Sequence, residues 1–240
     1  MLAQVCALHS AAMETARPQS VTGGFFLVLE GMDGAGTTSQ QTWLCQHLFQ
    51  QGFLPYKTAE PTENPTGKLI RQVLRGEHGA FCAHALALLF AADRADHLER
   101  EILPALSQGQ VVVCDRYVLS SLAYQTTAGV ATHLVEQANA AFGYPDLTVF
   151  FDLSVETAAQ RRAKRDQKPE IFEVEAFQRQ VAARYREQAD AWLAAGRPIV
   201  RLDAGRSFEE VSEELAKLVL AAIQGQQKQA GPPDRASRTG

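Results

Sequence analysis

A glycine-rich segment, GMDGAGTTSQ at residues 31–40, has the residue types and spacing of a phosphate-binding loop. The pattern is G-x-x-x-x-G-K-[ST], and Gly31, Gly36 and Thr38 occupy its two glycine positions and its hydroxyl position. Thr37 stands where the pattern has lysine. Glycines let backbone N–H groups approach an anion closely, and the hydroxyl suits a phosphate-bound Mg²⁺ ion. The segment therefore predicts a nucleotide site that lacks its usual lysine.

The same glycines could form a turn that merely joins a strand to a helix, and the missing lysine keeps that alternative open. The flanking segments favour the phosphate loop. FFLVLE at residues 25–30 is typical of a buried parallel strand, and residues 39–51 carry apolar side chains at helical spacing. The motif requires a strand before it and a helix after it, because the helix N-terminus adds partial positive charge.

Charged residues follow the predicted strands, at the edge where parallel sheets bind their ligands. Asp33 lies inside the glycine segment, Glu60 follows a second predicted strand, and Asp115 and Arg116 follow VVVC at residues 111–114. A carboxylate there suits Mg²⁺ or its water ligands, and an arginine can bind phosphate through two parallel hydrogen bonds. A simple cap or a surface ion pair is the alternative for the adjacent Asp and Arg, and both remain open.

A basic run, QRRAKRDQK at residues 160–168, contains five basic residues among its nine. Such a run is usually a solvated helix face. In a phosphoryl-transfer protein it has a second use, because positive charge must cover the moving phosphoryl group. Hydrogen bonds to charged groups contribute about 1.5–3 kcal/mol each, so one or two arginines from this run would offset the missing lysine.

Predicted strands and helices alternate along the chain. The predicted strands are residues 25–30, 52–58, 111–114, 147–153 and 198–203; the predicted helices are 39–51, 65–74, 83–106, 118–126, 132–142, 155–165, 173–195 and 208–223. The alternation predicts a parallel sheet with helices on both faces. Together with the glycine segment and the basic run, it leads us to expect an α/β protein with a three-layer P-loop NTPase fold, a parallel five-stranded sheet and a basic lid segment at about residues 160–173.

Composition narrows the class of protein further. The 240 residues carry a formal net charge of −4, which gives no reason to expect nucleic acid or an anionic membrane as partner. The four cysteines are widely separated, so neither a zinc site nor a disulfide framework is indicated. We expect one domain at residues 25–224, between a disordered extension at residues 1–24 and a disordered tail at residues 225–240.

Five segments in the same order resemble thymidylate kinases (dTMP kinases), a family of P-loop nucleoside monophosphate kinases. They are LEGMDGAGTTSQ, EPT at residues 60–62, LLFAADRADH at residues 88–97, DRYVLSSLAYQ at residues 115–125 and PDLTVFFDL at residues 145–153. The third and fourth are the most specific, because an ordinary P-loop protein has no reason to carry both. The resemblance implies ATP as donor with Mg²⁺, dTMP as acceptor, a cytoplasmic location and a homodimer.

The resemblance also implies roles for individual residues. Phe90 would stack on thymine, Arg94 would bind the base or the phosphate, and the amide of Gln125 suits the edge of thymine. The other residues implied for dTMP are Asp33, Glu60, Arg116, Ser120, Ser121 and Tyr124. Those implied for ATP are Gly31, Met32, Asp33, Gly34, Ala35, Gly36, Thr37, Thr38 and Ser39. Thr38 and Asp115 would hold the metal, and the catalytic set would be Asp33, Asp115, Arg116, Arg161 and Arg165.

The sequence departs from the family pattern at three places. Thr37 replaces the loop lysine, and Ala59 stands where bacterial members usually carry an arginine. Residues 166–173 do not reproduce the usual lid pattern, so the acting lid arginine stays open among Arg161, Arg162 and Arg165. Two alternatives to an active dTMP kinase therefore remain at this point: a catalytically impaired nucleotide-binding relative, and a kinase for another nucleotide.

Overall fold

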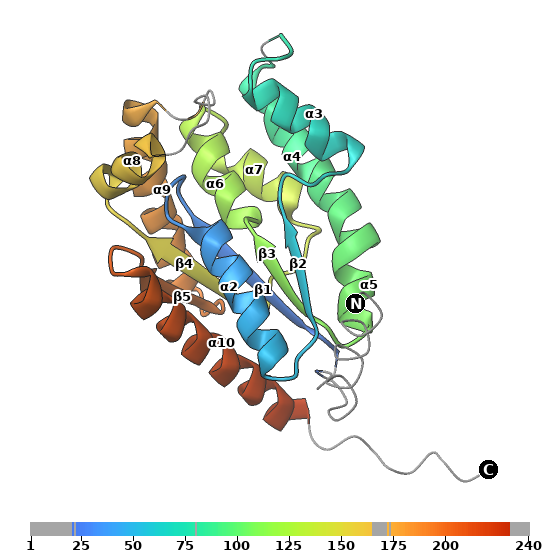
Figure 1. Ribbon diagram of the computed structural model, residues 1–240. Helices are drawn as coiled ribbons and strands as arrows, with labels where there is room; N and C mark the ends of the chain where they lie inside the picture. Colours follow the sequence, from blue (N-terminus) through green and yellow to red (C-terminus); the bar gives the residue numbers. More distant parts are fainter. Residues whose placement is uncertain (1–20, 22, 80, 165–171, 173, 231–240) are drawn as a thin grey trace, which may run out of the picture.

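The computed structural model describes residues 21, 23–79, 81–164, 172 and 174–230 (Figure 1). Its elements, in chain order, are β1 (Phe25–Gly31), α2 (Thr37–Gln50), β2 (Pro55–Ala59), α3 (Pro65–Leu74), α4 (Ala83–His97), a π-helical segment (Leu98–Ile102), α5 (Leu103–Ser107), β3 (Val111–Asp115), α6 (Val118–Thr127), α7 (Thr132–Asn139), β4 (Leu147–Asp152), α8 (Val155–Ala163), α9 (Glu175–Ala194), β5 (Ile199–Asp203) and α10 (Phe208–Ala230).

The five strands form one parallel sheet in the order β2-β3-β1-β4-β5, which confirms the predicted fold class. Helices α2 and α10 pack on one face, and α6 and α9 pack on the other (Figure 1). Strands β2 and β3 lie on one side of β1 in the sheet, and β4 and β5 lie on the other. The order in which strands are added therefore switches sides at β1. The carboxyl end of β1 is therefore the point where a ligand crevice is expected.

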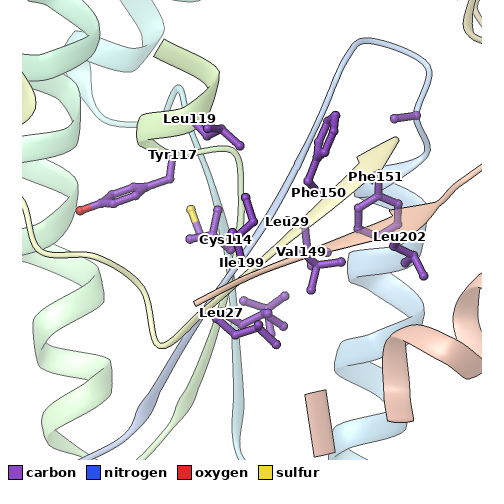
Figure 2. Close-up of a cluster of buried hydrophobic side chains, with 14 of the residues drawn as sticks. Leu27, Leu29, Cys114, Tyr117, Leu119, Val149, Phe150, Phe151, Ile199 and Leu202 are labelled. Atoms are coloured by element: carbon purple, nitrogen blue, oxygen red, sulfur yellow. The ribbon is translucent and has the colours of Figure 1, made fainter. Parts of the chain in front are cut away.

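The core lies on both faces of the three central strands. Leu27 and Leu29 of β1, Cys114 of β3, and Val149 and Phe151 of β4 are buried, and they lie close together in Figure 2. A strand covered by helices on both faces needs apolar side chains at successive positions. This explains the continuous apolar runs that the sequence shows at these strands.

The predicted long helix at residues 83–106 is interrupted as expected, slightly before Pro104. The π-helical segment precedes the proline, and the backbone N–H of Leu103 donates to the carbonyl of Leu98, five residues back. Pro104 has no N–H to donate, so the regular bond pattern of the helix cannot pass through it. The wider turn keeps the chain helical up to Ser107.

Several predicted boundaries are wrong. The helix after the glycine segment begins at Thr37 rather than residue 39, and the second strand begins at Pro55 rather than residue 52. The closing helix α10 runs to Ala230, so residues 225–230 are helical and not part of a disordered tail. Val21 is buried in the main core and its backbone N–H donates to the carbonyl of Gly109, so the predicted extension ends before it.

Among the described residues, we find no helix with both the length and the hydrophobicity that a membrane span requires.

Candidate active site

The glycine segment forms a phosphate loop between the end of β1 and the start of α2. Gly34 and Gly36 adopt positive φ angles of 94° and 91°, a region that favours glycine. A Cβ on Gly34 would lie 2.7 Å from the carbonyl oxygen of Ala158, so the close approach of α8 also requires glycine there. The loop surrounds a cavity of about 160 Å³, called here the loop cavity. Its lining contains Met32, Asp33, Gly34, Gly36, Thr37, Thr38, Ser39 and Arg116.

The first turn of α2 faces this cavity with backbone N–H groups, and no carboxylate side chain among the described residues caps them. Gly36 is the N-cap residue and offers no side-chain bond, and the first turn contains no acidic residue. The first N–H groups of a helix have no partner inside the helix and carry partial positive charge. Most of the predicted ATP-binding segment is thus arranged as an anion site, although Thr37 supplies no cation.

Thr38 and Asp115 meet at one corner of the loop cavity. The Thr38 hydroxyl donates to Asp115 Oδ2 at 2.6 Å, and Asp115 Oδ1 is buried with no hydrogen-bond partner among the described residues. An unpartnered buried carboxylate oxygen beside a hydroxyl fits a hard cation such as Mg²⁺. Within the described residues, no group of three or more His, Cys, Asp or Glu side chains could hold a metal. A metal ion here would therefore need phosphate oxygens or water as further ligands.

A larger cavity of about 300 Å³, called here the main cavity, adjoins the carboxyl ends of β1, β2 and β3. All nine residues that the family resemblance assigned to the acceptor line it: Asp33, Glu60, Phe90, Arg94, Arg116, Ser120, Ser121, Tyr124 and Gln125. They come from the phosphate loop, the segment after β2, helix α4 and the segment from β3 into α6. The fold brings together residues that are nearly a hundred positions apart.

Arg94 is fixed in the wall of the main cavity by a buried acidic partner. Its Nη2 lies 2.7 Å from Glu60 Oε2, and the two side chains are 1% and 3% exposed. The guanidinium also donates to Ser121 and Asn139, and it lies 4.9 Å from the centre of the Tyr117 ring. Because Glu60 balances its charge, Arg94 suits a neutral carbonyl better than a phosphate.

Gln125 presents an unused hydrogen-bonding atom in the same wall. The side chain is buried, and its Oε1 has no partner among the described residues. Buried amide oxygens nearly always have a partner, so this one is an indication of a missing ligand. An amide beside a charge-balanced arginine can offer both a donor and an acceptor to a flat heterocycle. Phe90, which is half-buried, lines the same cavity and can stack on such a ring.

Arg116 lies at the boundary between the two cavities and lines both of them. Its backbone has φ 75°, which is unusual for a residue other than glycine and aims the side chain toward the phosphate loop. Nη2 lies 2.6 Å from Asp33 Oδ1, and the Tyr124 hydroxyl donates to Asp33 Oδ2 at 3.0 Å. Burial raises the pKa of Tyr124 above its ordinary value, so this hydroxyl stays protonated and donates.

The lid segment reaches the phosphate loop through Arg162. Its Nη1 donates to the carbonyl oxygen of Asp33 at 2.5 Å. Arg161, which was named in the predicted catalytic set, makes no such contact in the described part of the chain, and Arg165 lies outside the described residues. Of the candidate lid arginines that the structure describes, Arg162 is therefore the one that contacts the phosphate loop.

Sequence reasoning missed four residues that complete the site. Arg71 and Phe172 line the main cavity, and Gln178 donates to Asp33 Oδ2 at 3.1 Å. Glu30 accepts hydrogen bonds from residues at the start of α6. Only Glu30 left a signal in the sequence, because a carboxylate at the end of the apolar run FFLVLE is unexpected for a strand buried on both faces.

Fold and site together define a class of protein. It has a phosphate loop between β1 and α2, the strand order 2-3-1-4-5, and a second cavity that shares Asp33 and Arg116 with the loop cavity. These are features of a P-loop nucleotide kinase.

Comparison with known proteins identifies the family. The thymidylate kinase family model matches residues 29–215. A probable thymidylate kinase of Pyrococcus abyssi is 38% identical over 206 residues, which cover 84% of this chain and 98% of the relative. A protein of the same description from Pyrobaculum aerophilum is 36% identical over 199 residues, or 82% and 97% of the two chains. The chain therefore belongs to the thymidylate kinase family.

Proposed function

We propose that the protein phosphorylates dTMP to dTDP with ATP and Mg²⁺, a step in the formation of dTTP. The observation that carries the proposal is the main cavity, in which all nine residues expected to bind dTMP line one space beside the phosphate loop. Family membership supports the same activity, as do the names of the similar proteins.

The base of the acceptor belongs at the Arg94 end of the main cavity. Thymine has two carbonyl oxygens and one N–H, and Gln125 Oε1 is a buried acceptor that needs a donor. The charge-balanced Arg94 supplies an N–H for a carbonyl oxygen, and Phe90 covers the ring. This leaves Arg116, at the boundary with the loop cavity, for the acceptor phosphate.

The transfer needs positioning and charge rather than a strong base. A phosphate monoester is already anionic near neutral pH, so its oxygen can attack without giving up a proton to the protein. Arg116 holds the acceptor at the boundary of the cavities, and Asp33 orients Arg116. Thr38 and Asp115 are the residues that would hold Mg²⁺, which neutralises charge on the donor phosphates when bound.

The missing lysine is compensated, in this proposal, by two arginines that lie beside the phosphate loop. Arg116 lines the loop cavity, and Arg162 contacts the loop backbone at Asp33. A guanidinium group can bind phosphate bidentately, which suits both arginines to this role. The catalytically impaired alternative draws no support from the site, because the acceptor residues and the Thr38–Asp115 pair remain assembled.

We further infer a cytoplasmic homodimer, as the family resemblance implies. Apolar side chains on the described surface, such as Leu88 of α4 with 62% exposure and Leu134 of α7 with 40% exposure, are available for packing against a second copy. Light scattering on the purified protein is expected to give twice the chain mass of 26.2 kDa. A mass of one chain would contradict the dimer.

A coupled assay of ADP release tests the proposed function. Purified protein, ATP and Mg²⁺ are combined with dTMP, and dUMP, dCMP, dAMP and dGMP serve as matched acceptors. We expect ADP formation that depends on dTMP and is much slower with purine acceptors. Binding of dTMP without turnover would contradict the enzyme and favour an impaired relative, and a preference for another nucleotide would contradict the assignment of the main cavity.

A further inference from the structure

Glu30, the last residue but one of β1, is a completely buried carboxylate that the mechanism above does not use. Its Oε1 accepts from the backbone N–H groups of Tyr117 at 2.8 Å and Ser120 at 3.2 Å. Its Oε2 accepts from the Ser120 hydroxyl at 2.5 Å and the Tyr185 hydroxyl at 3.2 Å. Acidic side chains are almost never fully buried unless they are paired. Four donors stabilise the carboxylate, and its position next to the phosphate loop needs an explanation.

The two hydroxyl groups that donate to Glu30 also contact Arg116. Arg116 Nη1 lies 3.4 Å from Ser120 Oγ and 3.3 Å from the Tyr185 oxygen, and these two oxygens are 2.7 Å apart. Glu30 is therefore linked to Arg116 through one layer of hydroxyl groups. Asp33 binds the other end of the same guanidinium directly. Arg116 is thus held from two sides by carboxylates, one direct and one relayed.

The charge on Glu30 decides which way the hydroxyl protons point. A hydroxyl group has one proton to donate and lone pairs that accept. When Glu30 is ionised, the Ser120 and Tyr185 protons point toward it or toward each other, so lone pairs face Arg116. When Glu30 is protonated, it can donate to Ser120, and the hydroxyl protons are free to turn toward the guanidinium, which repels them. Ionised Glu30 therefore favours the observed position of Arg116.

We propose that Glu30 is a positioning residue for phosphoryl transfer, which acts through the Ser120 and Tyr185 hydroxyls to hold Arg116 at the boundary between the two cavities. The inference rests on the proposed function, because Arg116 matters there for binding the acceptor phosphate. Glu30 itself lines neither cavity. Its effect is on geometry, where a displacement of about 1 Å can cost roughly a hundredfold in rate.

The surroundings of Glu30 give the effect a pH dependence. The titratable and charged groups that interact with it are Tyr117 at the N-cap of α6, Tyr185 of α9, Cys114 of β3 and Arg116. Burial raises the pKa of Glu30 above the ordinary value of a glutamate, while Ser120 and Arg116 oppose the rise. Burial also raises the pKa of Tyr185, so its hydroxyl stays protonated. As the pH falls, Glu30 gains its proton and the hold on Arg116 weakens.

Glu30→Gln tests the inference, because the amide keeps the size of the side chain and is neutral at every pH. In the ADP-release assay we expect kcat with dTMP to fall roughly tenfold to a hundredfold near pH 8. The ratio of wild-type to variant kcat is expected to shrink toward one as the pH is lowered. Taking the ratio removes the titration of the dTMP phosphate, which affects both proteins equally.

Tyr185→Phe provides a second variant that keeps the carboxylate and the packing. It removes only the hydroxyl between Glu30 and Arg116, and we expect kcat to fall by a smaller factor, about three- to tenfold. Tyr144→Phe is the matched control, since it makes the same change at an exposed tyrosine that lines neither cavity. If Glu30→Gln does not fold, as judged by circular dichroism, the comparison of Tyr185→Phe with Tyr144→Phe decides.

The outcomes distinguish a failure of the inference from a failure of the proposed function. Wild-type activity with dTMP establishes the function independently of any variant. A wild type with no dTMP-dependent turnover would overturn the function, and the inference with it. An active wild type with unchanged Tyr185→Phe kinetics, or with a Glu30→Gln ratio that is the same at all pH values, would overturn the positioning role alone.

Discussion

At the residue scale, the side chain of Gln125 needs a hydrogen bond that a ligand would supply. Its side-chain oxygen is buried without a partner in the described part of the chain, while the neighbouring polar groups of Arg94 are largely satisfied within the protein. A buried acceptor that lacks a donor costs about 1–3 kcal/mol until one is supplied. The acceptor base would supply that donor, so part of the binding free energy comes from relieving this cost.

Replacing Gln125 by methionine tests this role. The variant keeps the length of the side chain but has no amide, so we expect kcat/KM for dTMP to fall by about 5- to 150-fold, mainly through KM. Steady-state kinetics with dTMP varied at saturating ATP measure the change. Gln137→Met, on the exposed face of α7, is the matched control. Equal kinetics for the two variants would contradict the placement of the base.

Glu60 provides a second test at the residue scale, this time of stability. It is the buried partner of both Arg94 and His97, with its Oε1 lying 3.1 Å from His97 Nδ1. Glu60→Gln leaves Arg94 buried without its counter-charge, which costs about 3–5 kcal/mol in the free energy of unfolding. Urea denaturation measures the loss. Glu63→Gln, in the same loop but 79% exposed, is expected to cost less than about 1 kcal/mol.

At the scale of elements, the phosphate loop depends on how closely α8 approaches it. Gly34 has a positive φ, and any Cβ there would meet the backbone of Ala158. The lid segment continues from α8, and Arg162 of this helix reaches the loop carbonyl at Asp33. The contact between loop and helix therefore also sets where the lid arginine can lie.

Comparing Gly34→Ala with Gly76→Ala separates two effects of an added Cβ: the strain of a positive φ angle, and the steric clash with a neighbouring helix. Gly76 also has a positive φ, of 72°, but a Cβ there would meet nothing within 4 Å. Its substitution should cost about 1–2 kcal/mol in stability from backbone strain alone. Gly34→Ala should cost clearly more and should also raise the KM for ATP, because α8 must move away. Similar losses of stability and an unchanged KM in both variants would show that the close approach is unimportant.

Element positions could be predicted from the sequence where one local pattern decides them. The apolar runs of β1, β3 and β4 and the glycine loop lie where the sequence placed them. Boundaries were less accurate where no local signal marks them. Helix α10 continues past residue 223 and through Gly225 to Ala230, although glycine usually weakens a helix. In this part of the helix Gln226 donates to Asp146 Oδ1 at 3.3 Å, a contact across 80 positions that no local pattern encodes.

At the scale of the whole molecule, the site depends on contacts between distant segments. The resemblance to a family identified the nine acceptor residues that line the main cavity, because they lie in or beside short specific motifs, but it did not indicate Arg71 or Phe172. It did not indicate Gln178, which lies 145 positions from Asp33, or the link from Glu30 to Tyr185 across 155 positions. No local pattern encodes such a contact, since it arises only when α9 packs against α6 beside the loop. The sequence likewise left three candidates for the lid arginine, and only the position of α8 shows that Arg162 contacts the phosphate loop.

In the proposed mechanism, a phosphate loop without lysine supports phosphoryl transfer because Arg116, at the boundary of the two cavities, and Arg162, against the loop backbone, supply the positive charge. The most direct measurement is kcat of Thr37→Lys beside that of the wild type, with saturating ATP and dTMP. Arg116 and Arg162 already lie against the loop, so we expect lysine to change kcat by less than about threefold. A rise of roughly a hundredfold or more, the size of effect that a missing transition-state contact produces, would show that the arginines do not replace the lysine.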